Sequence, residues 1–123
     1  MEYIHTNNAP EAIGPYSQAV KVGNLVFTSG QIAINPATSQ IDADTIEAQT
    51  EQVCKNLCAV LEAAGSSIDR AVKTVCFLSD MDNFVKFNEV YGKYFVSKPA
   101  RSCVAVKTLP KNVLVEIDVI AEV

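Results

Sequence analysis

The sequence contains no tryptophan, one histidine (His5) and only two arginines, Arg70 and Arg101, against eight lysines. It has no apolar run near the roughly 20 residues that a membrane-spanning helix needs. It also has no low-complexity tract and no internal repeat. These absences argue against an integral membrane protein and make a histidine-rich metal site impossible.

Positive charge is scarce as well. Asp and Glu number 14 and Lys and Arg number 10, which gives a formal net charge of -4. A nucleic-acid-binding surface needs clustered basic residues, and no aromatic-plus-basic RNA motif is present. Binding to nucleic acid is therefore not expected.

Length and composition predict one domain spanning residues 1–123. The hydrophobic fraction is 49% and the charged fraction 20%, as in compact globular chains. The first residues, Met1 to His5, lack the basic and apolar regions of a signal peptide and the arginine-rich pattern of a transit peptide. The expected compartment is the cytoplasm.

The four cysteines are expected to be reduced thiols in that compartment. Cys54 and Cys58 lie four residues apart on a predicted helix. A metal site would need two further ligands, so we interpret both as small buried hydrophobes. No metal and no cofactor is predicted.

Periodicity predicts an α+β fold with two helices on one face of a mixed sheet. Residues 1–15 are predicted to form a loop. The predicted elements are strands at 19–22 and 25–29, a helix at 46–64, a strand at 72–79, a helix carrying 84–95, and strands at 102–106 and 114–123.

Capping residues predict the helix ends. Asp42 or Asp44 can begin the first helix and Gly65 can end it. Asp80 or Asp82 can begin the second helix. Pro99 is expected to stop the helix. Its inner face is predicted to carry five aromatic residues: Phe84, Phe87, Tyr91, Tyr94 and Phe95.

The last strand alternates between apolar residues on one side and mostly polar residues on the other. Two helices can cover only one face of the sheet. The other face would still carry apolar residues such as Val20, Val22 and Phe27, and such a patch usually marks an interface. We predict a homo-oligomer; the alternative is an ordinary two-layer domain with scattered surface apolar residues.

Arg101 follows Pro99 at the start of a predicted strand. Its planar fork suits bidentate binding of a carboxylate, which a lysine cannot reproduce. The alternative is a structural salt bridge to Glu116 or Asp118. Glu116 is either on a solvent-exposed face or, if partly buried, a general acid or base with a raised pKa.

Four further residues are candidates with ordinary alternatives. Tyr16 follows a Gly-Pro turn and either covers a pocket or simply packs. Gly30 either lets a ligand approach the backbone or marks a bulge. Cys103 has no neighbouring histidine to activate it, so we interpret it as a pocket wall, and Asn88 either contacts a ligand or faces solvent.

Taken together, the motifs resemble those of the RidA/YjgF family, in order and spacing along essentially the whole chain. The presence of both Arg101 and Glu116 matches the imine-deaminase subgroup. The motifs are Gly14–Ala19 (GPYSQA), Thr28–Gln31 (TSGQ), Asn88–Tyr91 (NEVY), Pro99–Val104 (PARSCV), Leu109–Pro110 and Val115–Ile117 (VEI).

The resemblance implies a chorismate-mutase-like fold and a homotrimer whose sheets form a central β-barrel, with clefts between subunits. It implies hydrolysis of 2-iminobutanoate and 2-iminopropanoate, which PLP-dependent dehydratases release, to 2-oxo acids and ammonia. Arg101 would bind the substrate carboxylate. Glu116 would activate the attacking water and relay protons to the departing nitrogen.

The resemblance also implies five substrate-binding positions besides Arg101. Ser29 and Gly30 would line the pocket, Tyr16 and Cys103 would form its walls, and Asn88 would approach from the adjacent subunit.

One departure is Lys98, which stands where the family commonly has an aromatic or aliphatic residue, at the expected pocket rim. The alternative functions are a small-metabolite-binding or regulatory trimer without turnover, a ribonuclease or translation inhibitor, and a chaperone-like protein.

Overall fold

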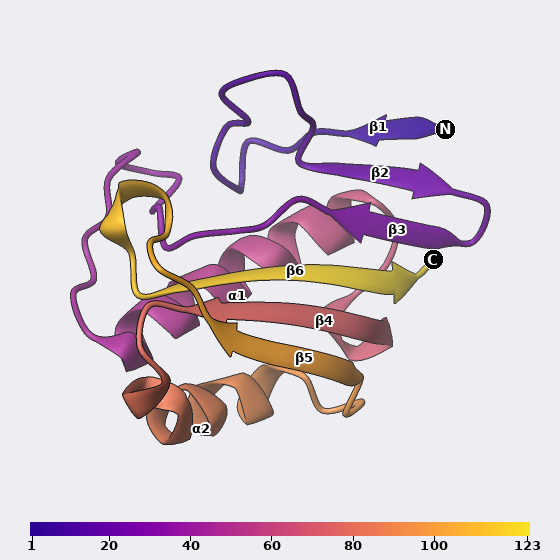
Figure 1. Ribbon diagram of the computed structural model, residues 1–123. Coiled ribbons are helices and arrows are strands. Elements are labelled where there is room, and N and C mark those ends of the chain that lie inside the picture. The colour runs from indigo at the N-terminus through magenta and orange to yellow at the C-terminus, as the bar shows by residue number, and fades with distance from the viewer.

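A computed structural model describes all residues 1–123 and shows a six-stranded mixed sheet with both helices on one face (Figure 1). The strand order is β1-β2-β3-β6-β4-β5, and only the β4–β5 pair is parallel. The elements are β1 (Glu2–Ile4), β2 (Ala19–Val22), β3 (Leu25–Thr28), α1 (Ile46–Ala63), β4 (Ala71–Leu78), α2 (Phe84–Tyr94), β5 (Ala100–Ala105) and β6 (Val115–Glu122). The α+β prediction is confirmed.

Helix α1 ends as predicted but begins with a different residue. Gly65 has a φ of 81° and donates to Glu62 O, while Ser66 donates to Leu61 O, which is a Schellman motif. At the other end the Thr45 side chain accepts from the Ala48 N–H at 3.2 Å. The predicted cap Asp42 instead accepts hydrogen bonds from Asn35 and Thr38 in the preceding turn.

Helix α2 is preceded by a 3₁₀ turn, Met81–Asn83, which the Asp80 side chain caps by accepting from the Asp82 N–H at 2.8 Å. Asp80 therefore begins the helical segment, as one of the two predicted alternatives. The helix ends at Tyr94, before Pro99 is reached. The inner-face prediction holds for three aromatic residues that are buried and two that are half-buried: Phe87, Tyr91 and Phe95, then Phe84 and Tyr94.

The N-terminal strand β1 was not predicted, because residues 1–15 look like a loop in sequence. Its three residues pair antiparallel with β2, with Tyr3 opposite Val20. Three residues are too few to show a period, so the pairing partner decides the structure.

Strand β6 lies in the middle of the sheet and separates its two faces. Val115, Ile117, Val119 and Ala121 are buried under the helices. Glu116, Asp118 and Ile120 alternate with them on the other face and are half-buried. We call this second side of the sheet the open face.

No element of the chain covers the open face (Figure 1). Register places Val20 opposite Phe27 and Phe27 opposite Ile120, so these apolar side chains form one patch. Val22 is 51% exposed and Phe27 36%. The uncovered apolar face is confirmed, and the oligomer inferred from it stays a prediction. No helix combines the length and apolar composition needed to cross a bilayer.

Candidate functional site

A cavity of about 350 Å³ lies at one end of the open face and contains three of the predicted site residues, Tyr16, Gly30 and Glu116. Its walls come from the N-terminal segment, from the chain just after β3, and from the turn before β6. Ile13, Ile32 and Pro110 supply apolar surface. The cavity therefore has both apolar and polar walls around the Glu116 carboxyl group, and Lys111 and Glu11 bring charged side chains to it.

Gly30, which has no side chain, leaves space for the Glu116 carboxyl group. Phe27 pairs with Ile120 and Gln31 pairs with Ile117. Between these two pairs the chain after β3 advances by four residues while β6 advances by three, so the chain after β3 contains a β-bulge. A Cβ on Gly30 would come within 2.9 Å of the Glu116 carboxyl carbon. The bulge, which was one of the alternatives for Gly30, therefore makes room for the carboxyl group.

The protonation of Glu116 is perturbed. Burial raises the pKa of this carboxyl group, and the nearby Asp118 raises it further. Burial also raises the pKa of Asp118. Both side chains project from β6 to the open face, two residues apart. Glu116 is thus a half-buried carboxyl group suited to exchanging protons closer to neutral pH than an exposed glutamate.

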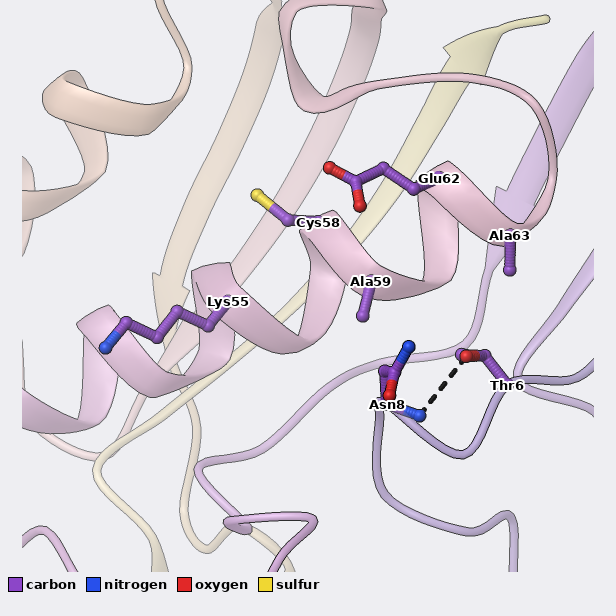
Figure 2. A pocket seen from close by; sticks show the side chains of 7 residues that line it. All are labelled: Thr6, Asn8, Lys55, Cys58, Ala59, Glu62 and Ala63. Atoms are coloured by element: carbon purple, nitrogen blue, oxygen red, sulfur yellow. Dashed lines mark hydrogen bonds between the residues drawn. The ribbon is translucent and has the colours of Figure 1, made fainter.

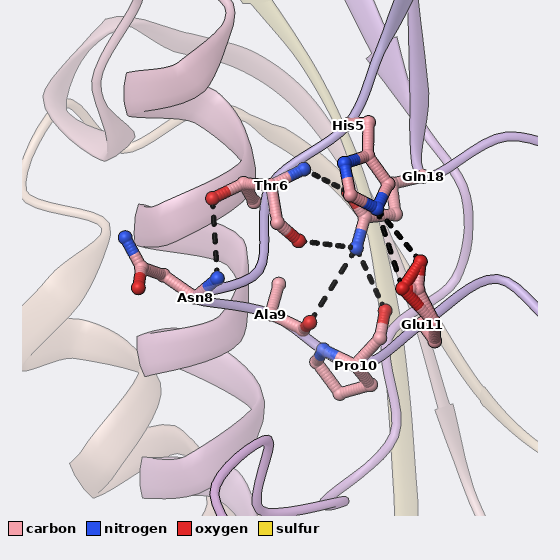
Figure 3. A network of polar contacts seen from close by, with 7 residues as sticks. All are labelled: His5, Thr6, Asn8, Ala9, Pro10, Glu11 and Gln18. Atoms are coloured by element: carbon pink, nitrogen blue, oxygen red, sulfur yellow. Dashed lines mark hydrogen bonds and ion pairs between the residues drawn. The ribbon is translucent and has the colours of Figure 1, made fainter.

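The N-terminal segment is fixed against this cavity by Gln18 (Figure 3). The buried Gln18 amide accepts from the Thr6 N–H at 2.7 Å and donates to Thr6 O at 3.0 Å and Pro10 O at 2.8 Å. His5 Nε2 lies 2.7 Å from a Glu11 carboxylate oxygen in the same segment. These contacts hold Pro10 and Glu11 where they line the cavity.

Ser29 is close to this cavity but does not line it. Its hydroxyl donates to Ser17 O and its N–H donates to Gln18 O at 2.9 Å. These bonds join the end of β3 to the segment that carries Tyr16. Tyr16 lines the cavity and is 53% exposed, so most of its ring does not pack against the chain.

Arg101 lies elsewhere, on the helix-covered side of the edge strand β5. It is paired with Thr74, whose buried side chain faces α2. Its Nη1 donates to Asn88 Oδ1 at 2.7 Å, and its Cζ lies 4.8 Å from the Tyr91 ring centroid. The guanidinium remains exposed.

Arg101 and Glu116 therefore project from opposite faces of the sheet. Glu116 is paired with Phe77 of β4, three residues from the Thr74 that pairs with Arg101, and odd separations along a strand reverse the face. The alternative of a salt bridge from Arg101 to Glu116 or Asp118 is wrong. The ion pairs of the chain join His5 to Glu11 and Lys21 to Glu2.

Asn88 accompanies Arg101 rather than facing it from another subunit. Helix α2 packs beside β5 of the same chain and brings the amide to the guanidinium, so Asn88 and Arg101 belong to the same subunit. The approach of Asn88 to the cavity of Tyr16 and Glu116 from an adjacent subunit stays a prediction. Because a guanidinium can only donate, the amide oxygen must be the atom facing it.

Cys103 lies two residues beyond Arg101 on the same side of β5, opposite Cys76. It is half-buried. Burial raises the pKa of its thiol, and the positive charge of Arg101 only partly offsets this. A thiol held protonated is a poor nucleophile, which argues against a nucleophilic role. Cys103 lines none of the cavities, so its role as a pocket wall stays a prediction. Cys54 is fully buried in the core, as expected.

A second cavity of about 440 Å³ lies between the N-terminal segment and α1 (Figure 2). The small Ala59 and Ala63 side chains face the segment, while Lys55 and Glu62 project away from it. Cys58 is the lining residue with nucleophilic chemistry, and burial raises its pKa. None of the predicted site residues lies here, so we place the functional site at the open face and at Arg101.

Lys98 has a φ of 52°, and it is exposed just before Pro99 and β5. A left-handed backbone is uncommon for a lysine and here turns the chain into the edge strand. Lys111 and Asn112 also have positive φ angles and form the turn before β6, where Lys111 lines the open-face cavity.

Asp118 and Lys111 were not predicted as site residues, although the alternation of the last strand places Asp118 beside Glu116.

Comparisons with known proteins agree with this architecture. The YjgF gene product of Escherichia coli superposes with a TM-score of 0.94 at 44% identity, covering 99% of this chain and 98% of that one. Escherichia coli TdcF, solved with bound serine, gives a TM-score of 0.94 at 42% identity over 100% of this chain and 99% of that one. These structures define a class of small α+β proteins with this sheet order and paired helices.

The sequence comparisons identify the family. A "RutC family protein" of Pyrococcus horikoshii is 54% identical over 98% of this chain and 96% of its own length. A family model described as endoribonuclease L-PSP matches residues 6–123. The chain belongs to this family, which is also known as the RidA/YjgF family.

Proposed function

We propose that this protein hydrolyses small 2-imino acids, 2-iminobutanoate and 2-iminopropanoate, to the 2-oxo acids and ammonia. We further propose that it acts as a homotrimer whose sites lie between subunits. Arg101, Asn88 and Cys103 would come from one subunit. Tyr16, Ser29, Gly30 and Glu116 would come from its neighbour, with Ser29 acting by holding the segment that carries Tyr16.

One observation carries this proposal. Arg101, which would bind the carboxylate, and Glu116, which would transfer protons, lie on opposite faces of one sheet. Arg101 is exposed and unpaired with any acid, and Glu116 lies in a cavity that Arg101 does not line. A second copy of the chain, docked through the uncovered apolar face, is the simplest way to bring the two groups to one small substrate.

Arg101 would fix the substrate through its carboxylate. The guanidinium has five N–H donors and uses one of them on Asn88, which leaves enough for a bidentate pair. The serine bound to TdcF is likewise a small molecule with a carboxylate and a nitrogen on the adjacent carbon. A fixed carboxylate orients the imine carbon toward the attacking water.

Glu116 would transfer the protons. As a carboxylate it takes a proton from water while the oxygen adds to the C=N carbon, and as an acid it returns that proton to the nitrogen. In the tetrahedral intermediate the ionised Glu116 then takes the hydroxyl proton and passes it to the amine, so that the C=O bond forms as the C–N bond breaks and ammonia leaves. The raised pKa of Glu116 suits one group to both steps.

The test is ammonia release from freshly generated 2-iminopropanoate, measured for the wild type, Arg101→Ala and Arg70→Ala. Arg70 is the other arginine and is exposed on the 3₁₀ turn before β4, so it is a matched control. Arg101→Ala should lose most of the enhancement over the spontaneous reaction, with its assembly unchanged by light scattering. Full activity in Arg101→Ala would refute the proposal.

The family model's description as an endoribonuclease raises RNA cleavage as a second candidate function. The net charge of -4 and the absence of a tryptophan argue against an RNA-binding surface on this chain. Highly purified protein should leave RNA intact. Cleavage that persists in Arg101→Ala would indicate a nuclease site separate from the proposed cleft.

A further inference from the structure

The Arg101 side chain is not isolated on its strand but packs against aromatic rings of α2. Its guanidinium carbon lies 4.8 Å from the Tyr91 ring centroid and 5.4 Å from the Phe84 ring centroid. Both rings come from α2. An arginine on a solvent-exposed strand edge would otherwise sample many rotamers.

Tyr91 is itself held on three sides. Its ring stacks on Phe95 with centroids 4.4 Å apart and contacts Phe87 at 5.4 Å. Its hydroxyl lies 2.8 Å from Thr74 Oγ1, and both side chains are buried. Thr74 is also the residue paired with Arg101 on the neighbouring strand. The ring that supports the guanidinium is therefore fixed to the same strand pair.

We infer that Tyr91 is a positioning residue that orients the Arg101 guanidinium through its ring face, while its hydroxyl serves only the core. The ring confines the guanidinium plane, and Asn88 Oδ1 fixes its rotation within that plane. The N–H groups not used by Asn88 then point outward in a set direction. This inference rests on the proposed function, in which Arg101 binds the substrate carboxylate.

Such a role predicts a larger effect on binding than on chemistry. The carboxylate is bound in both the ground state and the transition state, so a less well-oriented guanidinium raises KM. Because the bound carboxylate also aligns the imine carbon with the attacking water, kcat falls too, but by a smaller factor. Loss of a cation–π contact at an exposed guanidinium corresponds to roughly a two- to fivefold change in affinity.

The experiment compares Tyr91→Phe, Tyr91→Leu and Phe95→Leu with the wild type. The measurements are KM and kcat on 2-iminobutanoate, calorimetric affinity for 2-oxobutanoate, and Tm. Tyr91→Leu should raise KM and weaken 2-oxobutanoate binding by roughly fivefold, with kcat within about twofold of wild type. Tyr91→Phe keeps the ring and should keep KM within about twofold, although it also loses the Thr74 hydrogen bond.

Phe95→Leu is the packing control, because Phe95 stacks on Tyr91 without contacting Arg101. It should lower Tm and raise KM by less than Tyr91→Leu does, because the Tyr91 ring is still present. The inference fails if Tyr91→Leu leaves KM unchanged, if Tyr91→Phe raises KM as much as Tyr91→Leu does, or if Phe95→Leu raises KM equally.

Phe84→Leu keeps the test available if Tyr91→Leu does not fold, because Phe84 is only half-buried. It should raise KM by about threefold without changing kcat, and an unchanged KM would count against the ring platform. Failure of the proposed function itself looks different: Arg101→Ala would then be as active as the wild type in the same assay.

Discussion

On one face of the sheet Ile117 and Val119 enter a core that α1 closes, whereas on the other face Val20, Phe27 and Ile120 meet no element of the chain. The reactive groups divide in the same way. Arg101 and Cys103 lie on the helix side of the edge strand, and Glu116 and Asp118 lie on the open face. The comparison teaches that the covered face stabilises the subunit, while the open face is free to form an assembly and to complete a site.

The largest difference between the faces should appear in stability. Ile117→Ala leaves a cavity in the fully buried core and should cost about 2–5 kcal/mol of unfolding free energy. Phe27→Lys on the open face should leave the subunit folded, with an unchanged far-UV CD spectrum, and shift the assembly toward monomers in light scattering. A Phe27→Lys protein that unfolds, or that stays assembled, would contradict the assignment of that face.

A smaller effect is expected where the open face holds Glu116. Gly30→Ala introduces a Cβ within 2.9 Å of the Glu116 carboxyl carbon, so the carboxyl group must move. A displacement of about 1 Å should lower the rate of imine hydrolysis by about a hundredfold. Ammonia release measures it.

The matched control is Gly92→Ala in α2, where a Cβ meets nothing within 4 Å. It should leave activity unchanged and raise stability by up to about 1 kcal/mol, because alanine favours a helix. Equal activity in the two variants would mean that the position of Glu116 does not matter.

The smallest effect concerns the two neighbouring carboxyl groups. Burial raises the pKa of Asp118 and of Glu116, so the folded chain binds more protons than the unfolded chain between the ordinary and the raised pKa values. Stability therefore falls as pH rises through that window and stays lower above it. Asp118→Asn should raise Tm at pH 7, and this gain should vanish below the ordinary pKa of an aspartate, about 3.9.

Asp118→Asn should also move the pH–rate profile. Removing the neighbouring charge lowers the pKa of Glu116. If the ionised Glu116 is the base, as proposed, the rising acidic limb of kcat/KM should shift to lower pH. An acidic limb that does not move would separate Asp118 from the proposed chemistry.

Much of the fold could be predicted from local patterns. The 3.6-residue period marked α1, Gly65 marked its end, and the alternation of the last strand gave the two faces. The cap at Thr45 and strand β1 could not be found in this way. A cap is chosen among several nearby polar residues, and a three-residue strand depends on its partner.

Part of the candidate site could be predicted from the sequence, but not its arrangement. Tyr16, Gly30 and Glu116 meet at one cavity, and Arg101 is paired with no acid, whereas Ser29, Asn88, Arg101 and Cys103 line none of the cavities. The separation of Arg101 from Glu116 depends on the register of β5 and β6 against β4, and a shift of one residue would reverse the face. Sequence does not specify that register. The same limit applies to the contact between Asn88 and Arg101, because the packing of α2 beside β5 is a tertiary contact.

The central claim is that each site combines Arg101 of one subunit with Glu116 of another, and mixing two inactive variants tests it directly. Arg101→Ala and Glu116→Gln proteins would be dissociated, mixed in equal amounts, reassembled and assayed for ammonia release from 2-iminopropanoate. Shared sites predict recovery of about a quarter of wild-type activity, because each interface draws its two residues independently from the two proteins. A mixture as inactive as its components, with mixed assemblies verified by mass, would contradict the account.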